Sequence, residues 1–203
     1  MNKICLSVIL REDNDVPQLI ERIAGKEPDL VEFRLDCSKN LSFLAKVSKV
    51  KDYPIIATDR SGRDPLETKK ILYEAAEIGF DYIDVDLAHP FADAIIRNSK
   101  TRGVQVITSH HDSFGTPYED TLMQLLHLQI NAGSDICKIV TSATKANDNL
   151  TILDFVSKSA KVTKIVSFAM GKLGVPREFS RQSLGRNSHL LQLTTTQKPR
   201  LVS

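Results

Sequence analysis

The chain has 203 residues, of which 41% are hydrophobic and 26% charged, and its 27 basic and 25 acidic residues give a net charge of +2. This balance is typical of a folded domain and argues against a dedicated nucleic-acid binder, which needs a clustered basic face. No apolar run approaches the roughly 20 residues of a membrane span, and no signal peptide is recognisable. Three widely spaced cysteines, Cys5, Cys37 and Cys137, form no disulfide framework. We therefore expect a cytoplasmic protein that binds neither nucleic acid nor membrane.

Short apolar, β-branched runs recur along the chain. They begin near residues 3, 29, 54, 81, 104, 135, 164 and 189. Helical spacing fills several of the intervals, and it predicts helices over residues 65–79, 117–133 and 149–161. Pro65 and Pro117 suit first helical turns, and Gly79, Gly103 and Gly133 suit helix ends. Alternating strands and helices predict parallel strands joined by right-handed crossovers.

Two architectures fit this pattern, a closed (β/α)8 barrel and an open doubly wound sheet. No G-x-G-x-x-G fingerprint follows the first strand, and eight strand candidates favour the barrel. No linker or low-complexity segment interrupts the chain, so we predict a single catalytic domain over residues 1–203.

Polar residues interrupt several predicted strands at alternating positions. They are Glu32, Arg34 and Asp36, then Thr58, Arg60, Asp84, Asp86, Ser109, His111 and Lys138. One explanation is a strand face open to water, but helices should cover the outside of this sheet. The alternative is that these groups converge on the barrel axis near the C-terminal strand ends, where active sites of this fold lie.

Lys138 is the most informative of these residues. Apolar neighbours in the strand and the predicted cluster of cations should lower the pKa of its amine, which would make the amine a nucleophile. The other reading is a lysine that extends from a strand end to solvent. Periodicity does not separate the two readings.

His111 also has several readings from sequence alone. It could be a general base, a metal ligand or a hydrogen-bonded core histidine. A zinc site is poorly supported, because His89, His110, His111 and His127 lack ligand spacing, although His110 and Asp112 could share the opposite strand face.

Taken together, these residues resemble the type I 3-dehydroquinate dehydratases of the shikimate pathway, over roughly residues 3–185. The resemblance rests on five ordered segments: VEFRLD at 31–36, TDRS at 58–61, SHHD at 109–112, CKIV at 137–140 and FAMGKLGVPREFSR at 168–181. It implies a (β/α)8 barrel, a role in aromatic amino-acid biosynthesis, and the small-molecule substrate 3-dehydroquinate.

The resemblance implies a Schiff-base syn-dehydration to 3-dehydroshikimate. Lys138 matches the lysine that condenses with the C3 ketone of the substrate, and the iminium then accepts the electrons of the C2 carbanion. His111 matches the general acid/base that removes the C2 proton and protonates the departing C1 hydroxyl. No metal or cofactor is expected, because the lysine itself supplies the electron sink.

The resemblance also assigns residues to the substrate and its surroundings. Substrate contacts are expected from Ser7, Glu32, the backbone around Phe33, Arg34 and Arg60, with Arg181 clamping the carboxylate. The side chain of Phe33 should face the helices. Supporting positions are Asp64, which replaces a family glutamate that pairs with the histidine, Asp84 and Asp86 beside the lysine and arginines, and Met170 as an apolar wall.

After Gly185 the resemblance ends, and residues 186–203 are atypical for the family. The family continues with an aromatic-rich eighth strand, a substrate-covering loop and an eighth helix, so we expect an incomplete barrel at the eighth strand and helix. A set of codons that encodes residues 188–193 can, when read one base earlier, encode Phe-Thr-Phe-Ala-Thr-Thr, which resembles the eighth strand of the family. In the same shifted frame, codons for residues 198–203 can encode Lys-Ala-Ala-Pro-Gly-Gln. We hypothesise a one-base frameshift near Asn187, which resequencing of the gene tests.

Two other functions remain open at this point. A class I aldolase-type barrel would share the strand lysine, but it should bind sugar phosphates near strands seven and eight. The altered tail also allows an inactive remnant of the family. A homodimer remains a candidate assembly.

Overall fold

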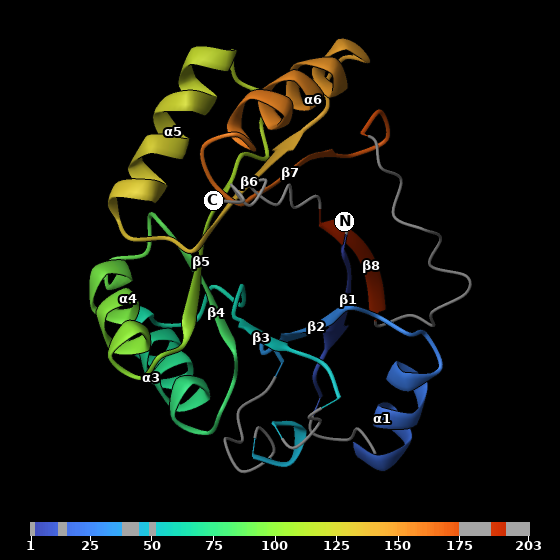
Figure 1. Cartoon of the computed structure of the whole chain (residues 1–203), viewed down its shortest axis with the longest axis vertical. Coiled ribbons are helices and arrows are strands. Elements are labelled where there is room, and N and C mark those ends of the chain that lie inside the picture. Colours follow the sequence, from blue (N-terminus) through green and yellow to red (C-terminus); the bar gives the residue numbers. More distant parts are fainter. Residues whose placement is uncertain (1–2, 12–15, 38–44, 49–51, 175–187, 194–203) are drawn as a thin grey trace, which may run out of the picture.

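The computed structural model describes residues 3–11, 16–37, 45–48, 52–174 and 188–193, with residues 3 and 188–193 described by their backbone alone. Its strands are β1 (Lys3–Ile9), β2 (Leu30–Arg34), β3 (Ile55–Thr58), β4 (Tyr82–Asp86), β5 (Gln105–His111), β6 (Ile136–Ser142), β7 (Ile165–Met170) and β8 (Ser188–Leu193). Each strand begins within one residue of its predicted start. The strands form one curled sheet in the order β7-β6-β5-β4-β3-β2-β1-β8 (Figure 1).

The helices lie on the convex side of this sheet (Figure 1). They are α1 (Val16–Ala24), α3 (Pro65–Glu77), α4 (Ala92–Thr101), α5 (Glu119–Asn131) and α6 (Asn147–Ser159). Pro65 opens α3 as predicted, but Pro117 precedes α5, whose N-cap is Tyr118. Gly133 has φ of +89°, a conformation open to glycine, and it follows α5 as predicted. No helix among these described elements is long and apolar enough to span a membrane.

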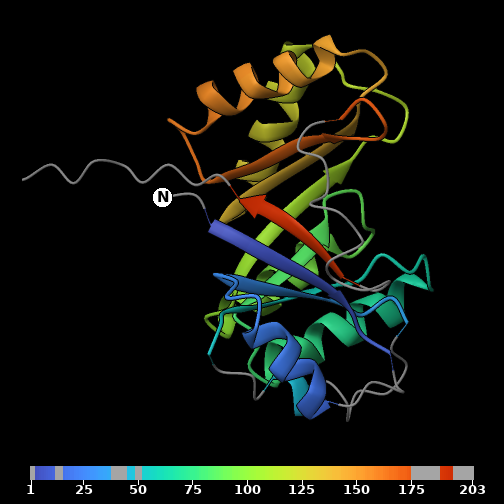
Figure 2. The same ribbon diagram turned by 90° about the vertical axis from the view of Figure 1, so that its right-hand side faces the viewer.

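Strands β1 to β7 run parallel, which confirms the alternating pattern. The prediction was wrong for β8, which pairs antiparallel with β1 from Ser188 opposite Val8 to Leu193 opposite Lys3 (Figure 2). β7 ends, and β8 begins, at the C-terminal end of the parallel strands, and an antiparallel β8 therefore starts from the end of the sheet where β7 stops. Within the described part of the chain no strand pairing joins β7 to β8. The result is a curled, incomplete barrel.

Apolar side chains on alternate positions fill both sides of the sheet. Toward the helices, Val31, Phe33 and Leu35 are fully buried, and the Phe33 ring meets the Phe80 ring edge-on with centroids 6.2 Å apart. The predicted orientation of the Phe33 side chain is therefore confirmed.

On the concave side, a second apolar cluster lies toward the N-terminal strand ends. Its buried members are Cys5, Leu30, Ile56, Ile107, Ile136 and Val166. Two residues further along five of these strands, the side chains become polar: Ser7, Glu32, Thr58, Ser109 and Lys138. The apolar cluster is thus a floor, and the polar groups form a layer above it toward the C-terminal ends of the strands.

Candidate functional site

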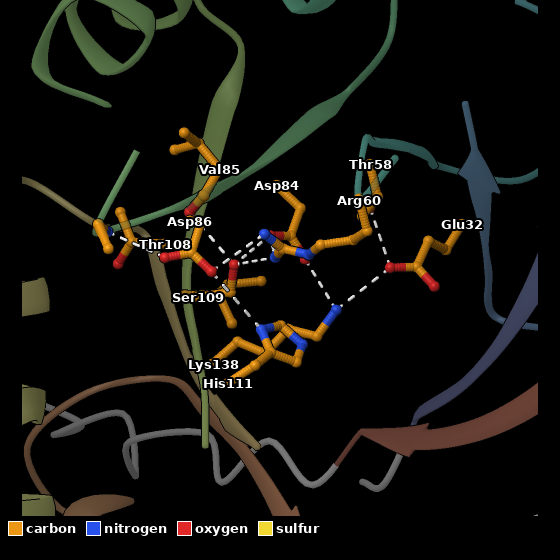
Figure 3. A network of polar contacts seen from close by, with 12 residues as sticks. Glu32, Thr58, Arg60, Asp84, Val85, Asp86, Thr108, Ser109, His111 and Lys138 are labelled. Atoms are coloured by element: carbon orange, nitrogen blue, oxygen red, sulfur yellow. Dashed lines mark hydrogen bonds and ion pairs between the residues drawn. The ribbon is translucent and has the colours of Figure 1, made fainter. Parts of the chain in front are cut away.

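The polar layer on the concave side gathers most of the residues predicted from sequence. Figure 3 shows Glu32, Thr58, Arg60, Asp84, Asp86, Ser109, His111 and Lys138 in one connected network of polar contacts. They come from five neighbouring strands, β2 to β6, or from the residues just beyond β3. Parallel strands bring their C-terminal ends to the same edge, which is why residues far apart in sequence meet there.

Lys138 is held at the centre of this network by two carboxylates. Its Nζ donates to Asp84 Oδ2 at 2.7 Å and to Glu32 Oε1 at 3.2 Å. All three side chains are buried, and the Asp84 side chain has no exposed surface. Burial of these charges is tolerable because each one faces an opposite charge and accepts or donates hydrogen bonds.

The structure corrects the expected ionisation of Lys138. Burial by itself lowers the pKa of the amine, but the charges of Asp84 and Glu32 raise it by more, and the net pKa lies above its ordinary value. The expected lowering by neighbouring cations was wrong, because carboxylates surround the amine more closely than cations do. The other reading, a lysine that extends from a strand end to solvent, is also wrong, because the ammonium points into the network.

Glu32 and Asp84 are correspondingly held ionised. Burial raises the pKa of the Asp84 carboxyl, but Lys138 and Arg60 lower it further, and it ends well below its usual range. Burial likewise raises the pKa of Glu32, while Lys138 and a hydrogen bond with Ser7 bring it below its ordinary value. Glu32 Oε1 also accepts a hydrogen bond from Thr58 Oγ1 at 2.9 Å.

Arg60, just beyond β3, ties the network together. Its Nη2 lies 2.7 Å from Asp84 Oδ1 and also donates to Ser109 Oγ, and its Nη1 lies 3.3 Å from Asp86 Oδ2. Arg60 therefore neutralises the carboxylates that Lys138 leaves partly unpaired.

Arg34, at the end of β2, is paired differently. Its guanidinium makes a two-pronged contact with Asp36, with Nε 3.2 Å from Oδ1 and Nη2 against Oδ2. Asp36 Oδ1 also accepts the backbone N–H of Arg60 at 2.9 Å. Asp36 thus links the Arg34 guanidinium to the segment that follows β3. The Arg34 side chain remains 29% exposed.

His111 ends β5 on the same side of the sheet as Lys138. In the strand register, Ser109 lies opposite Lys138, and His111 lies two residues further on, opposite Val140. About a third of the imidazole is exposed, 32%, and its Nδ1 is 3.8 Å from Asp86 Oδ2. The site therefore pairs a buried primary amine with a more accessible imidazole.

Asp64 does not take the place expected for it beside His111. Its carboxylate accepts the backbone N–H of Leu66 at 2.8 Å and caps the N-terminus of α3. The carboxylate next to the imidazole belongs to Asp86 instead. The shorter side chain of aspartate and the helix start at Pro65 account for this difference, because a residue in the N-cap position satisfies the first turn of its own helix.

The remaining predicted residues are placed as follows. Ser7 is buried in the polar layer beside Glu32, its register partner on the neighbouring strand. Met170 is the last residue of β7, and 45% of its surface is exposed. Its side chain can therefore contribute an apolar surface beside the site. Arg181 lies outside the described residues.

Sequence reasoning assigned no role to three polar residues around Lys138. Alternation had already placed Thr58 and Ser109 on the faces of Arg60 and His111, and the structure adds their partners, Glu32 for Thr58 and Asp84 for Ser109. The third is Gln129 on α5, which is fully buried and donates from Nε2 to the backbone oxygens of Thr108 and Lys138, each at 3.0 Å. It joins the strands that carry His111 and Lys138.

This arrangement has the components of carbonyl chemistry. A buried primary amine can condense with a ketone, an imidazole at the rim can carry a proton, and carboxylates and guanidinium groups can bind hydroxyls and an acid group. Within the described residues, no set of three or more histidine, cysteine or acidic side chains is arranged to hold a metal ion.

Comparison with known proteins points to one family. The sequence profile of type I 3-dehydroquinase matches residues 4–188. A 3-dehydroquinate dehydratase of Thermococcus gammatolerans is 33% identical over 170 residues, which cover 80% of this chain and 78% of that protein.

Solved structures agree with this match at the level of the fold. The crystal structure of 3-dehydroquinate dehydratase from Geobacillus kaustophilus superposes with a TM-score of 0.77 at 24% identity, covering 84% of this chain and 74% of that one. A type I 3-dehydroquinate dehydratase from Clostridium difficile, solved with covalently modified comenic acid, also gives 0.77 at 24% identity, with 90% and 80% covered.

Proposed function

The chain belongs to the type I 3-dehydroquinase family, and from this premise we propose that it dehydrates 3-dehydroquinate to 3-dehydroshikimate through a Schiff base on Lys138. The reaction is that of a hydro-lyase of the shikimate pathway. The observation that carries the residue assignment is the position of the Lys138 amine, buried at the centre of a polar network at the C-terminal strand ends.

The first step joins the lysine to the substrate. Lys138 must release one proton to become a free amine, since its carboxylate neighbours favour the ammonium. The amine then adds to the C3 ketone to give a neutral carbinolamine. The proton that the ammonium released returns to the carbinolamine hydroxyl, which leaves as water, and the nitrogen is left as an iminium with one positive charge. Asp84 and Glu32 therefore face a cation both before and after condensation, so they stabilise the iminium as they stabilise the ammonium.

The next steps eliminate water from C1 and C2. His111 takes the C2 proton, and the electron pair left on carbon is delocalised into the iminium to form an enamine. The enamine returns this pair, forms the C1–C2 double bond and expels the C1 hydroxyl, which leaves as water with the proton that His111 gives back. Hydrolysis of the product iminium releases 3-dehydroshikimate and restores Lys138.

The charged groups around the amine suit a polyhydroxylated carboxylic acid. We assign Ser7, Glu32, Arg34 and Arg60 to its hydroxyls, with support from their position in or beside the polar layer. Arg181 is assigned to the substrate carboxylate on the family resemblance alone. Asp84 and Asp86 support the lysine and the arginines.

An absorbance assay for the conjugated enone of the product tests this function directly. Purified full-length protein should produce that absorbance from 3-dehydroquinate, and aldol substrates should give no turnover. An enone signal absent from wild-type protein, together with no lysine adduct, would identify the chain as an inactive remnant of its family.

The location and assembly of the enzyme are also proposals. A cytoplasmic location is supported by its three free cysteines, of which Cys5 and Cys137 are buried and Cys37 is exposed. Cell fractionation tests it. For the assembly we retain a homodimer, and light scattering on the purified protein should give twice the chain mass of 22.6 kDa.

A further inference from the structure

We propose that Asp86, the last residue of β4, is the positioning residue that orients the imidazole of His111 for proton transfer. This inference rests on the dehydratase function proposed above. The role is one that the family resemblance would give to Asp64, and the structure separates the two carboxylates clearly.

The Asp86 carboxylate is held by two hydrogen bonds and faces His111. Its Oδ1 accepts the backbone N–H of Ala88 at 2.9 Å, and its Oδ2 lies 3.3 Å from Arg60 Nη1. The same Oδ2 is 3.8 Å from His111 Nδ1, across the ends of the paired strands β4 and β5 (Figure 3). A carboxylate held by its own turn and by an arginine has little freedom to leave the imidazole.

Asp86 carries the charge that this role requires. Burial raises the pKa of its carboxyl, but His111, the Ala88 N–H and Arg60 lower it by more, so the group is ionised. Asp64 has a different partner, because its carboxylate caps α3 through the backbone N–H of Leu66. The side chain of Asp64 is thereby committed to its own helix.

The consequence for His111 is a defined tautomer. A carboxylate facing Nδ1 favours the proton on that nitrogen, which leaves Nε2 as the lone-pair acceptor for the C2 proton. The charged groups that face this imidazole are Asp86 directly, Arg60 behind Asp86, and Lys138 on the neighbouring strand. The separation of 3.8 Å is longer than a hydrogen bond, and it should shorten when substrate binds, as catalytic contacts commonly do.

The test compares three carboxylate-to-amide variants. Asp86→Asn removes the proposed orienting charge, and Asp64→Asn removes the rival. Asp148→Asn is the matched control, because the Asp148 carboxylate also accepts backbone N–H groups, those of Thr144 and Lys145, but in the first turn of α6. Asp86→Glu tests rescue by a carboxylate.

Three readouts separate positioning from a structural effect. We expect Asp86→Asn to lower kcat roughly 10- to 100-fold, a part of what general acid/base catalysis contributes, with little change in KM. The deuterium isotope effect with C2-deuterated substrate should increase, while borohydride trapping on Lys138 stays at the wild-type level. Asp86→Glu should recover part of the loss, and Asp148→Asn should match wild type.

A fourth readout needs no turnover. Nitrogen-15 NMR of the imidazole should show the proton on Nδ1 of His111 in the wild-type protein and a mixture of tautomers in Asp86→Asn. The proposal is overturned if Asp64→Asn slows proton transfer more than Asp86→Asn, or if the tautomer does not respond to Asp86. Failure of the dehydratase function would give a different result, because the wild-type protein would then neither convert 3-dehydroquinate nor form a borohydride-trapped adduct on Lys138.

Discussion

Lys138 Nζ lies 2.7 Å from Asp84 Oδ2, and this contact defines the charge of the site before substrate arrives. Asp84 has no exposed surface and Glu32 stands on the other side of the amine. The pKa of Lys138 is consequently raised, although burial alone would lower it. The resting enzyme holds an ammonium, and in the proposed mechanism the same carboxylates stabilise the iminium that replaces it.

Replacement of Lys138 by methionine removes the ammonium but keeps an unbranched side chain. We expect turnover to be abolished, because no other buried amine is described in the site. The free energy of unfolding at neutral pH should fall by about 3–5 kcal/mol, because Asp84 and Glu32 lose the cation between them. Urea unfolding and the enone assay measure both effects. Near-wild-type turnover in this variant would rule out the Schiff base.

The same pair of proteins should respond to acid in opposite ways. Asp84 and Glu32 have pKa values lowered by folding, so their contribution to stability is present above their unfolded values and is lost as the pH falls below them. Wild-type protein should therefore lose stability below about pH 4. In Lys138→Met the unpaired carboxylates should bind protons more readily, so acidification from neutrality to about pH 5 should stabilise it.

Melting temperatures across this pH range measure the difference between the two proteins. A parallel pH response of wild type and Lys138→Met would contradict the assigned coupling between the lysine and its carboxylates.

Replacement of His111 by alanine should slow turnover by roughly 10²–10⁴-fold, the usual contribution of a general acid/base. The imidazole is a third exposed and makes no buried ion pair, so the fold should be retained. Borohydride should still trap some substrate on Lys138. Equal turnover in variant and wild type would place proton transfer on another group.

Replacement of Gln129 by leucine tests the connection between the two catalytic strands. The Gln129 amide donates to the backbone oxygens of Thr108 and Lys138, and leucine leaves both without this donor. We expect a loss of about 1–3 kcal/mol in unfolding free energy for a buried acceptor left unsatisfied. Urea unfolding measures it, with Leu128→Gln on the exposed face of α5 as the control. A loss no larger than in the control would contradict this role.

The strand starts and the polar layer could be predicted from sequence because both follow local rules. Alternate residues of a strand point to one side, so Glu32, Asp84 and Lys138 could each be placed on the concave face from their own neighbours. The parallel order then brings them to the same edge without further information.

The ionisation of Lys138 could not be predicted in the same way. Its partners Glu32 and Asp84 lie 106 and 54 positions away in the chain, and which charge stands closer to the amine depends on the register of five strands. Local apolar neighbours indicated a lowered pKa, and the distant carboxylates reversed the direction.

The capping role of Asp64 and the buried hydrogen bonds of Gln129 both have a signal in the local sequence. Asp64 followed by Pro65 is a helix-start signature, which identifies a capping carboxylate rather than a partner for His111. Gln129 falls at helical spacing from buried Leu122 and Leu126, and a polar residue in that apolar stripe signals a buried hydrogen bond. The direction of β8 had no such local signal, because either direction lets a strand pair with the edge of β1.

The measurement that tests the central claim most directly is borohydride reduction of the full-length protein in the presence of 3-dehydroquinate. Peptide mass spectrometry should locate one reduced adduct on Lys138, and the enone assay should show loss of turnover in proportion to adduct formed. Turnover that survives borohydride without an adduct, or an adduct on a different lysine, would contradict the Schiff base at Lys138.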